Sequence, residues 1–250
     1  MGEYCFIVYP IVSTLSQATI VRSKMPEMSH DLNDMADKIN SNTKIIFIAN
    51  PNNPTGGKIS RADLENFINQ TPKNTIIVID EAYTQYVKES ERLDVSEATK
   101  KHKNLLVLKT FSKAYGLAGL RVGYGVADKA IIENINKARE PFNVNALAQS
   151  AAIVALEDQK YIQKCVAMNQ EGMIYLKAEL NKLSVKHYPS YANFLLLEFK
   201  SEARLIYEEL LKRGVIVRPL VEYGMNNHLR VTIGTEEENK IFIEALGEVI

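Results

Sequence analysis

The chain has 250 residues, 30 basic and 30 acidic side chains, and a formal net charge of zero. The basic residues are dispersed, which argues against the clustered positive surface of a nucleic-acid-binding protein. No apolar run approaches the roughly 18 to 20 residues that span a bilayer, so no membrane partner is expected.

Two cysteines, Cys5 and Cys165, lie far apart and match neither a disulfide framework nor a metal-ligand spacing. We expect both to be buried as small hydrophobic side chains in a reducing compartment. The N-terminus has no basic region before an apolar core, so the sequence predicts a cytosolic protein. The four histidines have no ligand spacing between them, and no metal site is expected.

Three near-continuous runs of Ile, Val and Leu predict strands that are buried on both faces of a parallel sheet. They are Lys44 to Ala49, Thr75 to Asp80 and Leu105 to Thr110. Helical patterns alternate with them, and Ser60 with Asp63 resembles a capping box that opens one such helix. The alternation predicts an α/β fold, a doubly wound and mostly parallel sheet with helices on both faces, over residues 1–148.

After Pro141 the pattern changes. An Ala-rich stretch from Ala146 to Leu156 continues into further helical spacing, which predicts one long connecting helix. Shorter strand and helix patterns follow at Tyr191 to Phe199, Glu202 to Arg213, Gly214 to Arg218, Leu229 to Ile233, and from Thr235 onward. We therefore expect residues 149–250 to form the connecting helix and a small α+β domain.

Lys113 lies just beyond the third predicted strand, after a serine and before Gly116 and Gly119. Most lysines of the chain should be surface residues, but a surface lysine does not require this setting. An amine that forms a Schiff base must lose its proton, and neighbouring charge and desolvation favour that loss. We predict that Lys113 forms a Schiff base with an aldehyde.

Asp80 ends the second predicted strand, where it could simply cap the following turn. Its carboxylate is also suited to pair with a protonated ring nitrogen, which makes a pyridinium ring an electron sink. Tyr83 follows three residues later and can donate its hydroxyl to a ring oxygen. The alternative for Tyr83 is a packed aromatic side chain.

The segment from Asn50 to Gly56 follows the first strand and contains two prolines, so it forms a turn. Turn chemistry alone would account for Asn52 and Asn53. A loop stiffened by prolines can also present an amide side chain with little loss of entropy. We predict that Asn53 donates to the ring oxygen.

Thr110, Ser112 and Arg121 are suited to bind a phosphate through hydroxyl and guanidinium donors. The alternative for Arg121 is a surface ion pair. All these segments follow strands, and open α/β sheets place ligands at the carboxyl ends of their strands. Together they predict a site for pyridoxal 5'-phosphate.

Two further arginines lie near the C-terminus. Arg230 interrupts an apolar strand pattern, where an unpaired buried charge would be costly unless a carboxylate satisfied it. Arg218, before Pro219, is a second candidate for the same pocket, with a salt bridge at the rim as the alternative.

The residues resemble the class I/II aminotransferases of pyridoxal-phosphate fold type I, and within them the histidinol-phosphate aminotransferase subfamily. The likeness extends over essentially the whole chain. Besides the motifs above, the subfamily likeness rests on Arg139 to Asn145 followed by Gln149, and on Gly214 to Pro219 leading to Leu229 to Thr232.

The resemblance implies that Lys113 is the Schiff-base lysine and proton shuttle, and that Asp80 contacts the ring nitrogen. It places Asn53 and Tyr83 on the ring oxygen, and the phosphate on Thr110, Ser112 and Arg121. Arg230 would hold the substrate carboxylate, and Arg218 would face the substrate, including the phosphate of histidinol phosphate. Phe6 matches the position whose ring stacks on the cofactor; a core phenylalanine is the alternative.

The resemblance further implies a homodimer that exchanges an amino group between histidinol phosphate and 2-oxoglutarate, with glutamate as the other amino acid, in histidine biosynthesis. Family sequences extend beyond this chain at the N-terminus, with an arm over the active site, a glycine-rich turn at the phosphate and a tyrosine for the partner subunit. Three alternatives stay open: an aminotransferase for aromatic or other amino acids, a phospho-amino-acid decarboxylase, and a truncated non-catalytic remnant.

Overall fold

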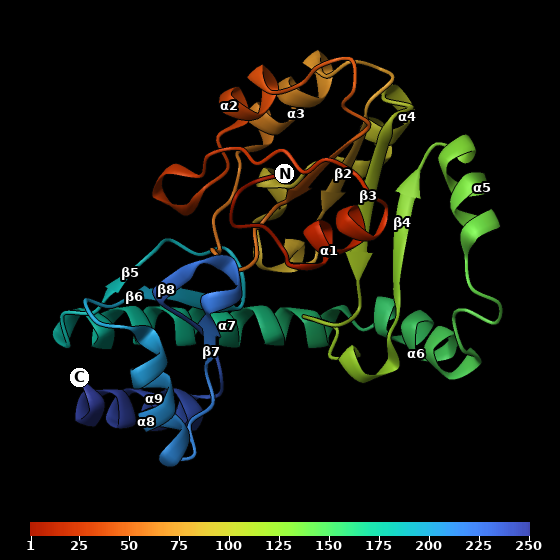
Figure 1. Cartoon of the computed structure of the whole chain (residues 1–250). Helices are drawn as coiled ribbons and strands as arrows, with labels where there is room; N and C mark the ends of the chain where they lie inside the picture. Colours follow the sequence, from red (N-terminus) through yellow and green to blue (C-terminus); the bar gives the residue numbers. More distant parts are fainter.

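Two four-stranded sheets organise the chain (Figure 1). The computed structural model describes all residues from Met1 to Ile250. The first sheet has the strand order β1-β2-β3-β4 and the second β5-β6-β8-β7. Figure 1 shows the first sheet in the upper part of the molecule and the second below it, where α7 (Gln159–Lys182) extends along the second sheet.

The first sheet contains the three predicted strands, β1 (Ile45–Ala49), β2 (Ile76–Asp80) and β3 (Leu105–Thr110), and they are parallel. A fourth strand, β4 (Gly123–Ala127), pairs antiparallel with β3. The apolar pattern did not indicate β4, because two of its five residues are glycines. The predicted α/β class with a mostly parallel sheet is confirmed.

Helices lie on both faces of this sheet. The short helices α2 (Leu32–Asp37), α3 (Arg61–Gln70) and α4 (Val95–Lys101) enclose one core with alternate residues of the strands. Full burial of each large aliphatic side chain in this core stabilises the fold by roughly 1.5–3 kcal/mol. On the other face α1 (Val8–Leu15) stacks Tyr9 on Phe47 of β1, with ring centroids 4.8 Å apart.

The cap of α3 forms in part as predicted. The Ser60 hydroxyl accepts a hydrogen bond from the backbone N–H of Asp63 at 3.1 Å. The Asp63 carboxylate accepts from the Ser60 hydroxyl at 2.5 Å and not from the Ser60 backbone. Aspartate is one methylene shorter than the glutamate of a full capping box, which accounts for the difference.

The predicted single connecting helix is wrong, because two helices occupy this region. They are α6 (Ala146–Glu157) and α7, preceded by α5 (Lys129–Ala138). Asp158 has a non-helical ψ of 67° and its carboxylate accepts from the backbone N–H of Tyr161, so it ends α6 and begins α7. The division predicted after residue 148 stays a prediction, and that position lies inside α6.

The cysteines differ in burial. Cys5 is buried next to Tyr9 and Ala49, as predicted. Cys165 lies on α7 and is half-buried, so the prediction of full burial is wrong for it. Its helix presents a mixed polar and apolar face there. Both thiols are free.

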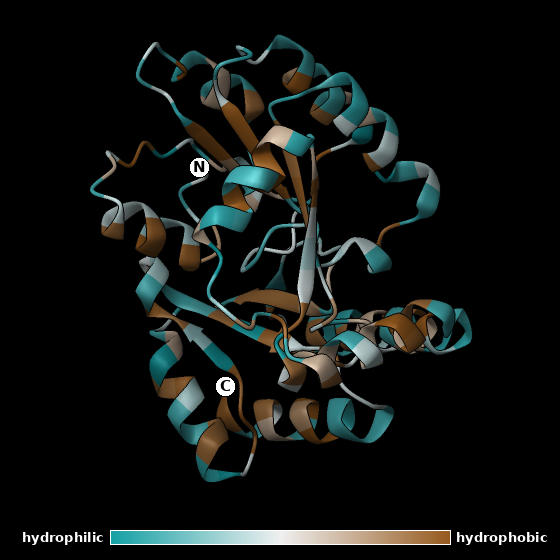
Figure 2. Cartoon of the chain, turned by 90° about the vertical axis from the view of Figure 1, so that its right-hand side faces the viewer, coloured by the Kyte–Doolittle hydropathy of each residue, from teal (hydrophilic) through white to brown (hydrophobic).

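The second sheet pairs β6 (Phe194–Glu198) with β8 (Met225–Thr232), flanked by β5 (Lys186–His187) and β7 (Arg218–Leu220). Helices α8 (Ala203–Lys212) and α9 (Glu236–Val249) pack with α7 against it, and Figure 2 shows apolar strands in both sheets. The strand predicted from Gly214 begins only at Arg218. Gly214 has a φ of +77° and Val215 donates to Leu210, so these residues end α8.

Five short 3-10 helices complete the secondary structure: Pro26–Met28, Thr84–Tyr86, Glu89–Glu91, Ala118–Leu120 and Val221–Tyr223. The final helix begins as predicted, with a complete capping box between Thr235 and Glu238. None of the helices combines the length and the apolar character that crossing a membrane requires.

Gly56 is where the loop after β1 meets the second half of the chain. Its φ is +81°, its carbonyl accepts from the backbone N–H of Tyr191 at 2.9 Å, and an added Cβ would lie 2.4 Å from the Ser190 hydroxyl oxygen. We expect Gly56→Ala to lower the free energy of unfolding by about 1–3 kcal/mol. Urea unfolding measures this; Gly119→Ala, with open space at its Cβ, is the control. Equal effects of the two substitutions would contradict the expectation.

Candidate active site

The predicted site residues come from both halves of the chain. The segments after β1 and β3 supply Asn53 and Lys113, Asp80 is the last residue of β2, and β8 supplies Arg230. The three strands are parallel, so their carboxyl ends lie at one edge of the sheet. That edge meets the second sheet, because Arg230 reaches across to Asn53.

Asp80 is held at both carboxylate oxygens. The backbone N–H of Ala82 donates to Oδ1 at 3.0 Å, and the Tyr9 hydroxyl donates to Oδ2 at 2.7 Å. Burial raises the pKa of Asp80, while these two hydrogen bonds and the charge of Lys113 act in the opposite direction. The carboxylate has no ion-pair partner among the basic side chains, so it is available for a cationic ligand.

Lys113 lies beside Tyr83, with its Nζ 5.3 Å from the ring centroid. Burial lowers the pKa of Lys113, and the positive charges of Arg230 and Arg121 lower it further, against the opposing effect of Asp80. Tyr83 is buried, packs edge-on against Phe194 at 5.3 Å, and burial raises its pKa to about 12. Its hydroxyl therefore keeps its proton and can donate. Tyr83 is thus a packed aromatic side chain that also borders the amine.

Asn53 differs from the other asparagines of its loop. The Asn50 Oδ1 accepts from the Ile59 backbone, and the Asn52 amide donates to Tyr4 O at 2.7 Å, so these two side chains hold the loop itself. The Asn53 Oδ1 instead accepts from Arg230 Nη1 at 2.5 Å. With its oxygen bound to a cation, the amide nitrogen of Asn53 is the group left to donate to a ligand.

Arg230 lies near the C-terminal end of β8, over the ring of Phe194 at 5.1 Å. Its Nε is buried and has no hydrogen-bond partner. A buried unsatisfied donor on a charged group is costly. An anionic ligand would satisfy it, as the sequence pattern indicated.

Three residues were predicted to bind a phosphate, and two of them, Thr110 and Ser112, are hydrogen-bonded to each other. The Thr110 hydroxyl accepts from the Ser112 backbone N–H at 3.1 Å. Arg121 is exposed, has a left-handed φ of 54°, and donates to the Ala118 carbonyl at 2.8 Å. It makes no ion pair, so the alternative of a surface ion pair does not hold, and the guanidinium can take an anion.

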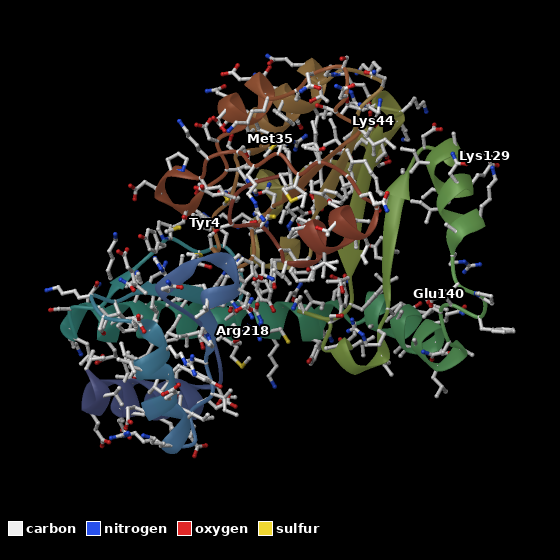
Figure 3. The ribbon with its side chains drawn as sticks, viewed as in Figure 1. Tyr4, Met35, Lys44, Lys129, Glu140 and Arg218 are labelled. Carbon is white, nitrogen blue, oxygen red and sulfur yellow. The ribbon has the colours of Figure 1, made fainter.

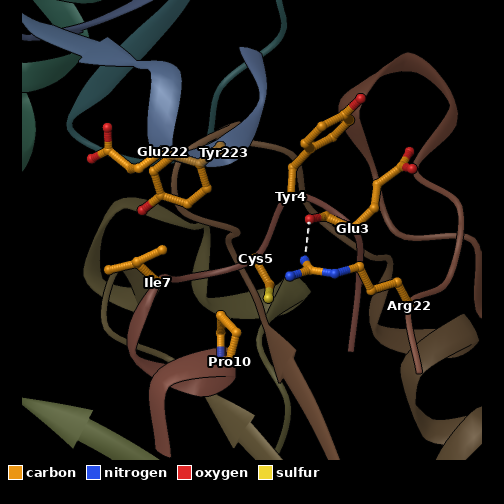
Figure 4. A pocket seen from close by; sticks show the side chains of 8 residues that line it. All are labelled: Glu3, Tyr4, Cys5, Ile7, Pro10, Arg22, Glu222 and Tyr223. Atoms are coloured by element: carbon orange, nitrogen blue, oxygen red, sulfur yellow. Dashed lines mark hydrogen bonds between the residues drawn. The ribbon is translucent and has the colours of Figure 1, made fainter. Parts of the chain in front are cut away.

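Arg218 and Arg230 are directly opposite on β7 and β8 and therefore lie on one face of the second sheet. Arg218 is exposed and forms an ion pair with Glu222, which is the rim salt bridge considered as its alternative. Glu222 and Tyr223 line a cavity of about 300 Å³ against Cys5 and Ile7 (Figure 4). An anionic substrate reaching Arg218 has to compete with Glu222.

Phe6 precedes α1 and is half-buried, with its ring edge-on to Tyr9 at 5.7 Å. It belongs to the small apolar cluster of Cys5, Tyr9 and Ala49, which agrees with a packed side chain. Sequence reasoning missed Tyr9, whose hydroxyl binds Asp80. The signal was an aromatic residue three positions after Phe6, but its target is 71 residues away, and no local pattern indicates such a contact.

The residues fit pyridoxal 5'-phosphate. Three groups of the site match three groups of the cofactor. The aldehyde would react with Lys113, whose pKa is lowered, and the ring nitrogen would pair with the buried carboxylate of Asp80, which has no basic partner. The phosphate would bind Arg121, which makes no ion pair. The orphaned Arg230 Nε is a fourth group, suited to the carboxylate of an amino-acid substrate.

Comparison with known proteins identifies the family. A family model described as aminotransferase class I and II matches residues 5–246. A curated relative from Idiomarina loihiensis, named histidinol-phosphate aminotransferase 1, is 46% identical over 248 residues, which are 99% of this chain and 68% of the relative.

Solved structures agree in fold. The histidinol-phosphate aminotransferase of Clostridium acetobutylicum superposes with a TM-score of 0.91 at 28% identity, covering 98% of this chain and 75% of that one. The enzyme of Sinorhizobium meliloti, solved in complex with pyridoxal-5'-phosphate, superposes with a TM-score of 0.92 at 24% identity, covering 99% of this chain and 68% of that one. The chain belongs to the class I and II aminotransferase family.

Proposed function

We propose that the chain is a pyridoxal-phosphate-dependent histidinol-phosphate aminotransferase. The observation that carries the proposal is the convergence of Lys113, Asp80 and Tyr83 with Asn53 and Arg230 at one edge of the first sheet. The 46% identity to a histidinol-phosphate aminotransferase over nearly the whole chain supports this substrate class over other aminotransferases.

Each residue has a distinct role in this proposal. Asp80 would hold the ring nitrogen, Asn53 and Tyr83 would donate to the ring oxygen, and Phe6 would stack on the ring. Thr110, Ser112 and Arg121 would hold the phosphate. When bound, pyridoxal phosphate supplies an electron sink that stabilises negative charge at the substrate Cα.

Lys113 moves the proton. Its amine is neutral at a lower pH than that of an ordinary lysine, because it is desolvated and close to Arg230 and Arg121. In its neutral form the amine would bind the cofactor aldehyde with loss of water; once displaced by the substrate amine, it would take a proton at Nζ as general base and return it as general acid. Tyr83 borders this amine, with Nζ of Lys113 5.3 Å from its ring centroid.

Substrate anions bind on the second sheet. Arg230 takes the carboxylate of glutamate or 2-oxoglutarate, and Arg218, opposite on the neighbouring strand, takes the phosphate of histidinol phosphate after displacing Glu222. In this proposal Arg218 and Arg230 belong to one pocket. It binds the phosphate of one substrate and the carboxylate of the other in turn.

Turnover with a panel of amino donors tests this substrate assignment. We expect histidinol phosphate to exceed phenylalanine in kcat/KM by about 10⁴-fold, the discrimination of a site whose polar groups stay unpaired when the substrate lacks their partner. Phosphothreonine, tested for release of carbon dioxide, examines the decarboxylase alternative. Faster turnover of phenylalanine, or carbon dioxide release, would overturn the assignment to histidinol phosphate.

The lowered pKa of Lys113 predicts how its reactivity depends on pH. The fraction of neutral amine rises with pH, and its midpoint should lie below the value of about 10.4 for an ordinary lysine. The rate at which pyridoxal phosphate labels Lys113, trapped with borohydride and read by mass spectrometry, measures this midpoint. Arg230→Gln removes a neighbouring positive charge and should move the midpoint upward. A midpoint equal to that of exposed Lys129 would contradict the expectation.

The proposal includes a homodimer. Four large apolar side chains on and just before α6 are more than 60% exposed: Phe142, Leu147, Ile153 and Val154. An apolar surface of this kind is typical of a protein interface. Light scattering should show a dimer, and Leu147→Glu with Val154→Glu should shift it to monomer. A parent chain that is monomeric with cofactor bound would count against this part of the proposal.

We propose that the protein is cytoplasmic, because both of its cysteines are free and the proposed reaction belongs to small-molecule metabolism. Fractionation of cells that produce the chain with an epitope tag tests this location. Recovery with the periplasmic or membrane fraction would overturn it.

A further inference from the structure

Tyr9 is a buried aromatic residue next to the proposed cofactor site. It lies in the first turn of α1, is 4% exposed, and its hydroxyl donates to Asp80 Oδ2 at 2.7 Å. Its ring is fixed on two sides. It stacks on Phe47 with an interplanar angle of 13° and meets Phe6 edge-on at 83°.

Tyr9 is the one side chain that hydrogen-bonds Asp80. The other donor, the Ala82 backbone N–H, comes from the turn that follows Asp80 itself and would be present in any turn of this kind. The bond from Tyr9 spans 71 residues and ties the first helix to the end of β2. A carboxylate bound at both oxygens has a defined plane, and its remaining lone pairs have defined directions.

The direction of this hydrogen bond is set by the environment. Burial and the neighbouring carboxylate raise the pKa of Tyr9 far above its usual value, so the proton stays on the phenol. Because an ionised carboxylate can only accept, Tyr9 donates to Asp80, and this donation to the anionic form lowers the pKa of that carboxyl. Lys113 is the cation that faces Asp80, and Cys5 and Tyr83 are the other titratable groups near the phenol.

We propose that Tyr9 is a positioning residue for the proposed aminotransferase reaction, because it orients Asp80 and keeps this carboxylate anionic. The proton that Asp80 would share with the cofactor then stays on the ring nitrogen. The inference rests on the proposed function for its cofactor. Removing the phenol makes Asp80 a stronger base, and the shared proton moves toward the carboxylate. The ring then becomes a weaker electron sink.

The contact of Tyr9 with Phe6 adds to this role. Phe6 is the side chain proposed to stack on the ring, and Tyr9 supports it from the edge at 5.7 Å. One side chain therefore contacts both Phe6, proposed to stack on the cofactor ring, and Asp80, proposed to hold the ring nitrogen.

Tyr9→Phe tests the proposal, because it removes the hydroxyl and keeps the ring that packs on Phe47. Tyr188→Phe is a matched control. Tyr188 is also buried and also donates its hydroxyl to a carboxylate, that of Glu198, but it lies in the second sheet. Any loss that follows merely from deleting a buried phenol should appear in both variants.

The first measurement needs no cofactor. Carboxyl carbon NMR of the chain labelled at aspartate follows the titration of Asp80, identified by its absence in Asp80→Asn. We expect Tyr9→Phe to raise the Asp80 midpoint by about one to two pH units, the effect of losing a hydrogen bond to a charged group, and Tyr188→Phe to leave it unchanged. An unchanged midpoint in Tyr9→Phe would overturn the proposal.

The second measurement uses pyridoxal phosphate labelled with nitrogen-15 in the ring. We expect Tyr9→Phe to move the ring nitrogen signal toward that of an unprotonated pyridine and to weaken cofactor binding about tenfold or more, whereas Tyr188→Phe matches the parent. A shifted Asp80 midpoint with an unchanged ring signal would make Tyr9 merely structural and overturn its role. A parent that binds no cofactor would overturn the proposed function instead, and the Asp80 titration would still decide whether Tyr9 controls this carboxylate.

Discussion

Replacing Lys113 with alanine is expected to abolish the absorbance band that added pyridoxal phosphate gives with the parent chain. The same substitution should reduce turnover on histidinol phosphate by on the order of 10²–10⁴-fold, the range for removal of a general acid–base. The reason is that Nζ of Lys113 is both the group that reacts with the aldehyde and the group that carries the proton. Nζ lies beside Tyr83, and its pKa is lowered by burial and by the charge of Arg230, and raised by that of Asp80.

Two control variants separate chemistry from charge. Lys113→Arg keeps a positive charge but cannot react with an aldehyde, so it should lose the band as alanine does. Lys129→Ala removes an exposed lysine on α5, which lies far from Arg218 in Figure 3, and should match the parent. A band that survives in Lys113→Ala would show that another amine reacts, and the assignment of Lys113 would be wrong.

Replacing Asp80 with asparagine should separate function from stability. Turnover is expected to fall by roughly a hundredfold or more, because the ring nitrogen loses the anion that keeps it protonated. The free energy of unfolding of the cofactor-free chain, by contrast, should not decrease. Such a trade between stability and function is typical of residues in active sites.

The sign of the stability effect follows from the raised pKa of Asp80. The native chain binds this proton more tightly than the unfolded chain does, so stability decreases as pH rises from the unfolded to the native pKa. At neutral pH the buried carboxylate is a net cost that the amide removes.

Asp128 provides the opposite case for the same measurement. Its hydrogen bond from Ala130 and its ion pair with Lys103 lower the pKa of Asp128, so its charge is favourable to folding. Asp128→Asn should therefore lower stability slightly and leave turnover unchanged. Urea unfolding of both variants at neutral pH decides the matter, and a clear loss of stability in Asp80→Asn would refute the expectation.

Local sequence patterns predicted the three parallel strands and the chemistry that follows each of them. Runs of Ile, Val and Leu of this length are typical of strands buried on both faces, and Asp80 and Lys113 stand at their ends or just beyond. The same patterns failed where the signal was weak. The two glycines of β4 interrupt its apolar pattern, so this strand was not predicted. Asp158 ends α6, whereas the composition predicted that the helix continues.

The sequence by itself determined the family and the fold class and predicted the residues proposed to carry the chemistry, because these depend on residue types at short spacings. Only the tertiary structure decided which groups meet: Arg230 with Asn53 across 177 residues, and Tyr9 with Asp80 across 71. The first pair depends on how the two sheets pack, and the second on how α1 packs on the first sheet. That packing is set by the summed burial of many side chains, and no single motif encodes it.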